Sequence, residues 1–306
     1  MSFSSEIKNE VSILPIAMKR DVILAELSAI LRLSGIYHLG TKQTVEIQTS
    51  NPASARRVYR LIQTAFPQIE LQTNIETFAG QRTHRYGVII SDESQKVLDT
   101  LKIDPFSPVN VIPMKFYSSA QKQNAILRGA FIASGSISDP KSGNYHFEIY
   151  SNNNYLVKQL QTIFEDIIPF KTTSRRDGTV LYIKKSNLIA DILDLIGANQ
   201  SRLKYEKSVS QKANKNEANR LSNVDNVNID RALSAGSSQV DEIKFIEEHG
   251  GLSKLDVKVQ TIAQARLENP GASLSDLGEM LEPKMSKSGV KHRLNKIHDL
   301  YLEMIS

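Results

Sequence analysis

The feature that most constrains the fold is an internal repeat in the first part of the chain. The segment Leu24–Gly35 reads LAELSAILRLSG, and Ala125–Gly135, about one hundred residues later, reads AILRGAFIASG. Both segments are apolar around much of a helical circumference, contain small residues and end in Ser-Gly. A helix of this kind is buried on most sides, and its small residues let a neighbouring backbone approach closely.

The correspondence continues through further segments of the two copies. The matched segments either alternate apolar and polar residues, as half-buried strands do, or have helical spacing. The pairs are Thr44–Asn51 with His146–Asn153, Leu61–Phe66 with Gln159–Phe164, Tyr86–Ile90 with Val180–Lys184, and Val97–Leu101 with Ile192–Ile196. Each copy is therefore predicted to follow the order α-β-β-α-β-β-α, with copy one at about 20–105 and copy two at about 122–205.

One copy alone has a very apolar helix that it cannot cover. Two copies can bury both helices by packing them against each other on a pseudo-twofold axis, and their sheets then form a saddle. We therefore predict an α+β fold, in which residues 1–205 form a duplicated αββαββα saddle and an all-α domain follows.

This arrangement resembles the LAGLIDADG homing endonucleases, whose paired motif helices form the interface between the copies. In that family each helix ends in an acidic residue just before a glycine, and the two acids hold the metal ions that cut DNA. On this chain the glycines are Gly35 and Gly135, and the acidic positions are Ser34 and Ser134. A hydroxyl is a poor replacement for a carboxylate as a ligand of a hard cation. We therefore expect degenerate metal positions that no longer support two-metal cleavage.

Glu46 and Glu148 are acids that match between the copies, on the polar faces of their strands. They leave open a metal-dependent DNA endonuclease that uses this pair. We favour the alternative that both are solvated strand glutamates, which would repel phosphate if they line the saddle. On that interpretation the duplicated domain is an inactive scaffold that binds nucleic acid weakly, if at all.

Composition excludes several other kinds of chemistry. The chain has 306 residues and no cysteine, so disulfides, thiol nucleophiles and thiolate zinc sites are ruled out. No phosphate-cradling or nucleophile motif is present, and we expect no catalytic residue, metal or cofactor. Charges near the start argue against a signal peptide, and no stretch is apolar enough to span a membrane. We expect a cytoplasmic protein whose net charge of +5 permits an acidic partner.

Beyond residue 205 the composition changes. Residues 206–224 are basic and rich in Asn and Ser, and we interpret them as a linker rather than as an arm that contacts phosphates, although one segment could do both. A helical pattern follows from residue 225 and stops at Gly250-Gly251. Its core candidates are Val240, Ile243, Phe245 and Ile246.

The last fifty residues predict a helix-turn-helix unit, within a domain that spans 225–306. Ser273 and Asp276 form a start resembling a capping box for a short helix. After a turn, Ser286 or Ser288 can cap a second helix that runs to about Tyr301. Two helices of this length around a short turn, with a third before them, are the layout of a DNA-reading module.

The second helix has two chemically different sides. Val290, Leu294 and Ile297 fall on one side and face inward. The rest is basic or polar, with no acid between residues 284 and 296, and this suits phosphates and base edges. The alternative is an ordinary solvated helix face. The predicted DNA-binding residues are Ser273, Lys284, Ser286, Lys287, Ser288, Lys291, His292, Arg293, Asn295 and Lys296.

Four longer blocks carry a second resemblance, which covers essentially the whole chain. They read MSFSSEIKNEV, LRGAFIASGSISDPKSGNYHFEI, NEANRLSNVDNVNIDRA and LSDLGEML…KMSKSGVKHRLNKI. These blocks resemble the WhiA family of bacterial regulators, which combines a degenerate LAGLIDADG scaffold with a C-terminal helix-turn-helix. The resemblance implies a nucleoid-associated transcriptional regulator of cell division and chromosome segregation, and of sporulation in some relatives.

Three functions remain, and we favour the first. It is a non-enzymatic transcriptional regulator that binds double-stranded DNA through the helix-turn-helix, with RNA polymerase or another regulator as the expected kind of protein partner. The second is the endonuclease that would use Glu46 and Glu148. The third is a protein-interaction module whose basic helix contacts no DNA. The sequence leaves the operator, the direction of regulation and the oligomeric state open.

Overall fold

The computed structural model describes residues 2–40, 43–77, 84–175 and 177–306. The chain divides into two compact units, Met1–Ala213 and Asn214–Ser306, which are described separately below. One helix, α8 (Asn199–Glu248), starts in the first unit and continues into the second. None of the helices in the described ranges is both long and apolar enough to cross a membrane.

Copy one has the predicted order of elements. In sequence they are α2 (Arg20–Ser34), β1 (Gly35–Leu39), β2 (Gln43–Thr49), α3 (Pro52–Ala65), β3 (Leu71–Thr77), β4 (His84–Ile90) and α4 (Ser94–Leu101). The strands form an antiparallel sheet in the order β1-β2-β4-β3, so that β1 and β3 are its edges.

Copy two repeats both the element order and the strand order. Its elements are α5 (Ala120–Ser134), β5 (Gly135–Ile137), β6 (Phe147–Ser151), α6 (Asn154–Phe164), β7 (Lys171–Arg175), β8 (Gly178–Ile183) and α7 (Ser186–Leu195). Their sheet has the order β5-β6-β8-β7. The α+β fold and the αββαββα pattern predicted for each copy are therefore confirmed.

The strand pairing corrects one match between the copies. Val45 lies opposite Ile90 in copy one, and its counterpart Phe147 lies opposite Ile183 in copy two. The segment that corresponds to 86–90 is therefore 179–183, one residue earlier than the sequence match of 180–184. A one-residue slip would have turned every side chain of the strand to the wrong face of the sheet.

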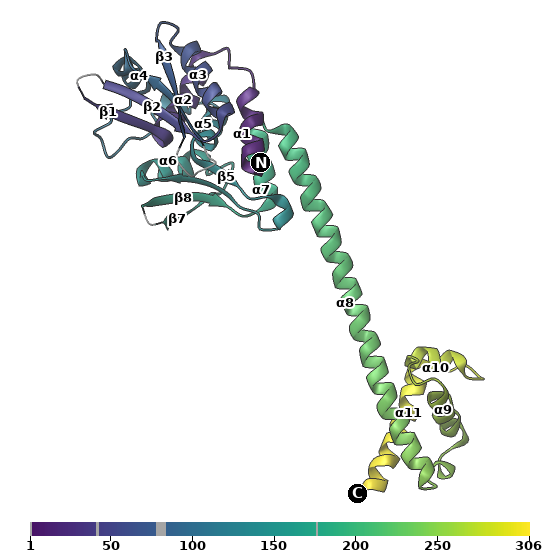
Figure 1. Ribbon diagram of the computed structural model, residues 1–306. Helices are drawn as coiled ribbons and strands as arrows, with labels where there is room; N and C mark the ends of the chain where they lie inside the picture. Colours follow the sequence, from purple (N-terminus) through teal and green to yellow (C-terminus); the bar gives the residue numbers. More distant parts are fainter. Residues whose placement is uncertain (1, 41–42, 78–83, 176) are drawn as a thin grey trace. The chain divides into compact units, whose positions relative to one another are not determined.

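The two apolar helices pack against each other, as predicted, and join the copies through one hydrophobic core (Figure 1). The helices approach closely at Gly129, because a Cβ atom there would lie only 2.4 Å from the backbone oxygen of Glu26. Ala25, Ala29 and Ala130 in these helices are fully buried. Small side chains therefore allow the close backbone contact on which the duplicated fold is built.

A helix that the repeat does not contain, α1 (Phe3–Ile13), also belongs to the first unit. Its Ser4 hydroxyl donates to the backbone oxygen of Ile137 in β5 (2.7 Å) and accepts from the Ile137 amide (2.8 Å). Short 3-10 turns, η1 (Met114–Phe116) and η2 (Pro140–Ser142), lie in the loops before α5 and before β6. The segment before the repeat thus binds the edge strand β5 of copy two.

The second unit is all-helical, as predicted. After α8 it contains η3 (Leu252–Lys254), α9 (Val257–Glu268), α10 (Leu274–Met280) and α11 (Lys287–Ile305). Of the core candidates in α8, Ile243 and Ile246 are fully buried, whereas Val240 and Phe245 are half-buried. The remaining core is supplied by α9, α10 and α11.

Candidate nucleic-acid interface

Local hydrogen bonds cap the starts of α10 and α11. The Ser273 hydroxyl accepts from the Asp276 amide (3.2 Å), and the Asp276 carboxylate accepts from the Ser273 amide (3.1 Å), so the predicted capping box is present. Ser286, rather than Ser288, caps α11 by accepting from the Gly289 amide (3.3 Å). Both hydroxyls therefore have a structural task at a helix start.

Gly278 lets the turn fold back onto α10. The Met285 amide donates to the Gly278 oxygen (2.9 Å), and a Cβ atom at Gly278 would stand only 2.1 Å from the Met285 oxygen. Any larger residue would push the turn away from α10 and change the position of α11. The geometry of the helix-turn-helix therefore depends on a glycine at position 278.

The inward and outward faces of α11 lie as the helical spacing predicts. Val290, Leu294 and Ile297 are buried in the core of the second unit. The side chains expected on the opposite face are all exposed, and they are Ser288, Lys291, His292, Asn295 and Lys296. Lys287, at the first position of the helix, is also exposed.

The basic side chains of this region differ in what they contact. Lys284 pairs with Glu279 of α10 (2.6 Å), although both side chains are largely exposed. Arg293 is half-buried, and its Nη1 donates to the Gly289 oxygen (3.2 Å) and contacts the Met285 sulfur (3.1 Å). Arg293 therefore holds the turn against α11, a role that the sequence did not indicate.

We call the three exposed lysines of α11 its basic face; they are Lys287, Lys291 and Lys296. Within the described ranges no carboxylate lies within ion-pair distance of these three side chains, whereas Lys284 has its partner. The face ends at Asp299, which follows Asn295 by about one helical turn. Positive charge is thus concentrated on the amino-terminal half of α11, where the free backbone amides also favour phosphate.

The positions that correspond to the nuclease acids lie at the ends of the paired helices. The Ser34 hydroxyl donates to the Ile30 oxygen of its own helix (2.9 Å). The Ser134 hydroxyl is buried and has no hydrogen-bond partner among the described residues. The helix ends are capped instead by the Gly35 and Gly135 amides, which donate to carbonyls one turn back.

The interpretation of Glu46 as a solvated glutamate is wrong. Glu46 is only 7 % exposed, and its carboxylate accepts hydrogen bonds from Gln48 (3.1 Å), His38 (3.3 Å) and Asn74 (3.3 Å). Burial alone would raise the pKa of Glu46, but these hydrogen bonds together hold the pKa below its ordinary value. Neighbouring strands fill the polar face with donors, which a strand pattern taken by itself does not reveal.

Glu148 is half-buried and is also engaged. Its carboxylate pairs with Arg175 of β7 (2.7 Å) and with His146, the residue just before β6 (3.0 Å). Within the described ranges no three His, Asp or Glu side chains are grouped so that they could hold a metal ion. Donors thus occupy the carboxylate oxygens that an endonuclease would need for its metal ions.

A buried ion cluster between the copies was not expected from the sequence. Glu26 of α2 accepts two hydrogen bonds from Arg57 of α3 (2.6 and 3.0 Å) and one from Arg128 of α5 (3.2 Å). Arg57 also donates to the Leu14 oxygen, and Arg128 to the Ile196 oxygen. Glu26 is the one acid within the apolar segment 24–35. Its place there could have indicated the cluster, because a buried carboxylate needs a partner.

Three family models match successive parts of the chain. The WhiA N-terminal LAGLIDADG-like domain matches residues 20–104, and the WhiA LAGLIDADG-like domain matches residues 123–215. The WhiA C-terminal HTH domain matches residues 218–301. The helix-turn-helix described above lies within this last match.

Full-length relatives and solved structures agree with these matches. A protein from Oenococcus oeni is 40% identical over 99% of this chain and 98% of its own length, and one from Enterococcus faecalis is 38% identical over 98% and 97%. Both are named "Probable cell division protein WhiA".

Full-length WhiA from Thermatoga maritima has the same fold, with a TM-score of 0.61 over 99% of both chains at 21% identity. The N-terminal LAGLIDADG domain of WhiA covers 64% of this chain and 90% of its own length, with a TM-score of 0.52 at 21% identity. The chain therefore belongs to the WhiA family, as two LAGLIDADG-like copies followed by a helix-turn-helix domain.

Proposed function

We propose that this protein is a non-enzymatic, DNA-binding transcriptional regulator that acts in cell division and chromosome segregation. The observation that carries the proposal is the basic face of α11, whose lysines are exposed and lie at the start of the second helix of a helix-turn-helix. Such a helix enters the major groove with its amino-terminal residues at the base edges. The names of the relatives support the link to cell division.

The side chains of α11 and its turn suit different parts of a DNA duplex. Lys287, Lys291 and Lys296 would contact phosphates, and Ser286 and the first amides of the helix would add hydrogen bonds to the backbone. The exposed side chains between the lysines would face base edges, and they are Ser288, His292 and Asn295. Lys284 would contact phosphate beside the turn, and Ser273 would do so at the start of α10. Arg293 would act by holding the turn in place.

The binding proposal is tested by a salt titration on the full chain. We expect the variant Lys287→Ala/Lys291→Ala/Lys296→Ala to lower the slope of log K against log salt by about three units, since each phosphate contact contributes about 0.9. The matched control is Lys244→Ala/Lys254→Ala/Lys258→Ala, which removes the same charge from exposed positions of the same unit. Equal slopes for the two variants would contradict the proposal and would favour a module that contacts protein alone.

The regulatory role needs a second measurement, in cells. We expect bound chromosomal sites to be lost when the last ninety residues are removed, and to be lost in the triple lysine variant as well. Nucleoid association and an RNA polymerase or regulator partner belong to this proposal, because a short helix-turn-helix reads few base pairs by itself. Retention of the same sites without the helix-turn-helix would assign DNA recognition to the duplicated unit.

The duplicated unit is proposed to be non-catalytic because Glu46 and Glu148 are engaged by donors and Ser34 and Ser134 are neutral. We expect purified protein to leave supercoiled plasmid intact in Mg²⁺ or Mn²⁺. Nicking that is lost in the variant Glu148→Ala would establish the endonuclease instead.

A further inference from the structure

A cleft of about 420 Å³ on copy one is lined by residues of α3, β3 and β4. Its apolar lining includes Ala55 and Tyr59 of α3, Ile75 of β3 and Tyr86 of β4. Ile75 lies directly opposite Tyr86 in the strand pairing. Two large apolar side chains thus form one floor at the outer edge of the sheet, because β3 is an edge strand.

The floor lies on the face of the sheet that packs against α3, at the edge that α3 leaves partly uncovered. Val88 and Ile90 alternate with Tyr86 along β4 and are buried in the core, so Tyr86 and its partner Ile75 belong to the same face. Asn74 points to the other face, where it donates to Glu46. Ile75 is nevertheless 65 % exposed and Tyr59 is 37 % exposed. The core of copy one therefore ends before this edge, and the apolar surface continues into solvent.

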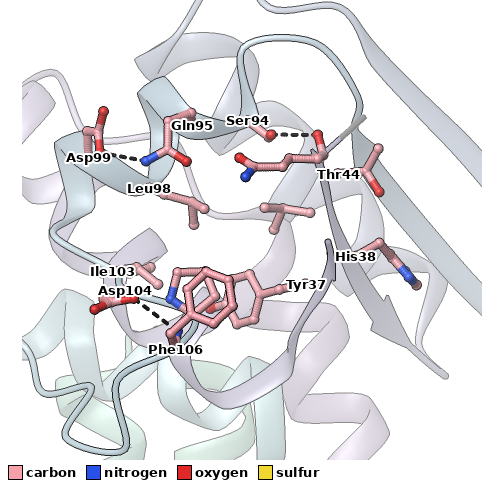
Figure 2. Close-up of a pocket in the computed structure, with 13 residues that line it drawn as sticks. Tyr37, His38, Thr44, Ser94, Gln95, Leu98, Asp99, Ile103, Asp104 and Phe106 are labelled. Atoms are coloured by element: carbon pink, nitrogen blue, oxygen red, sulfur yellow. Dashed lines mark hydrogen bonds between the residues drawn. The ribbon is translucent and has the colours of Figure 1, made fainter. Parts of the chain in front are cut away.

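The charges around this floor have one sign. Arg56 and Arg60, one helical turn apart on α3, are exposed and line the cleft, and none of its described lining residues is a carboxylate. A second cleft, of about 230 Å³, lies by the opposite edge strand, β1, and has the opposite charge (Figure 2). Asp99 and Asp104 line that cleft. The two clefts would therefore attract ligands of opposite charge.

Among the described residues, copy two has no apolar pair at the equivalent place. The strand pairing makes Ser174 and Thr179 the counterparts of Ile75 and Tyr86, and β7 is exposed along its whole length. The duplicated fold therefore forms with small polar residues at this place. The apolar pair of copy one is not required for the fold, which points to a binding role.

We propose that this cleft docks an acidic segment of another protein, which inserts a large apolar side chain over Ile75 and Tyr86 and pairs its carboxylates with Arg56 and Arg60. The charge of the rim selects an anionic partner, and the apolar floor would contribute nothing to binding of DNA phosphates. The exposure of Ile75 and Tyr59 disfavours a small ligand, because small-molecule sites cover most of the ligand surface. This site goes beyond DNA binding and gives copy one a partner that copy two cannot share.

Methyl NMR of the full chain, with labelled Ile and Ala, tests the proposal directly. The probe is the acetylated and amidated peptide Glu-Glu-Leu-Phe-Glu-Glu, and the control peptide has lysine in place of glutamate. We expect the Ile75 and Ala55 methyl signals to shift with the acidic probe at about 1 mM and not with the control. Methyl signals of the second unit should stay in place.

Charge reversal gives the matched variants. We expect Arg56→Glu/Arg60→Glu to weaken the acidic probe about tenfold or more. The control Lys158→Glu/Lys171→Glu, at exposed positions of copy two, should leave its affinity unchanged. Unshifted methyl signals outside the cleft show that each variant is folded.

Several results would overturn the proposal. These are no shift at Ile75 with the acidic peptide, equal shifts with the lysine peptide, or equal weakening by both charge reversals. Stronger shifts with benzoate alone would make the cleft a small-molecule site, and shifts with a DNA duplex would make it part of the DNA interface. Neither peptide result depends on whether α11 binds DNA, so the two proposals can fail separately.

Discussion

The two units differ in how they hold their charges. In the duplicated unit Glu26, Glu46 and Glu148 each accept hydrogen bonds from cationic or polar side chains. In the second unit the basic face of α11 is exposed to solvent. The difference teaches that paired charges here join parts of the fold, whereas unpaired charges are available to a partner. The four predictions below test this contrast, in order of decreasing effect.

Removing the buried carboxylate should have the largest effect. Glu26→Ala leaves Arg57 buried without its partner at the junction of the copies, and we expect the free energy of unfolding of the first unit to fall by about 3–5 kcal/mol. Urea unfolding followed by circular dichroism measures the change. Glu26→Gln keeps one acceptor and should cost less. If both variants were as stable as the wild type, the cluster would have no part in joining the copies.

Single substitutions on α11 should separate phosphate contacts from base contacts. We expect Asn295→Ala to change the preference among DNA sequences by about 1–3 kcal/mol, because a lost base contact matters at one position of the site. Lys291→Ala should weaken all sequences alike and lower the salt slope by about one unit. Binding to a panel of duplexes measures both effects, with Lys258→Ala as the control. A change in sequence preference from Lys291→Ala alone would reverse the two roles.

Acid should remove the contribution of Glu46 to stability. Because its folded pKa is lowered from the ordinary value of 4.5, the contribution is complete above that value and is lost as pH falls through the folded pKa. We expect Glu46→Gln to cost about 1 kcal/mol at pH 7. Urea unfolding should show this difference shrinking at a pH below the folded pKa. The exposed Glu70→Gln serves as the control, and a difference that stayed constant with pH would contradict the assignment.

The exposed pair beside the turn should have the smallest effect. Glu279→Gln frees Lys284, so DNA binding should tighten by less than about 1 kcal/mol, as for other exposed pairs. Glu303→Gln makes the same change in net charge near the other end of α11. Fluorescence anisotropy at low salt compares the two. Equal gains would show that only net charge matters and that Lys284 lies outside the interface.

The sequence predicted the architecture because the repeat supplies each element twice. It also predicted which side of α11 is buried, since helical spacing needs only local information. It failed where strands from distant parts of the chain meet. The burial of Glu46 depends on His38 and Asn74, and the correct match of β4 with β8 depends on pairing with β2 and β6. Arg293 was predicted to contact DNA, but its contact with Met285 depends on the path of the turn, which helical spacing does not reveal.

The absent side chain at Gly129 has a consequence for how this family can diverge. It brings α5 against the backbone of Glu26, the residue whose carboxylate holds Arg57 and Arg128. A methyl group added there would separate the two halves and loosen their shared ion cluster in the same step. Spacing and charge at this junction are therefore coupled, and no substitution at position 26 would relieve a clash with its backbone oxygen.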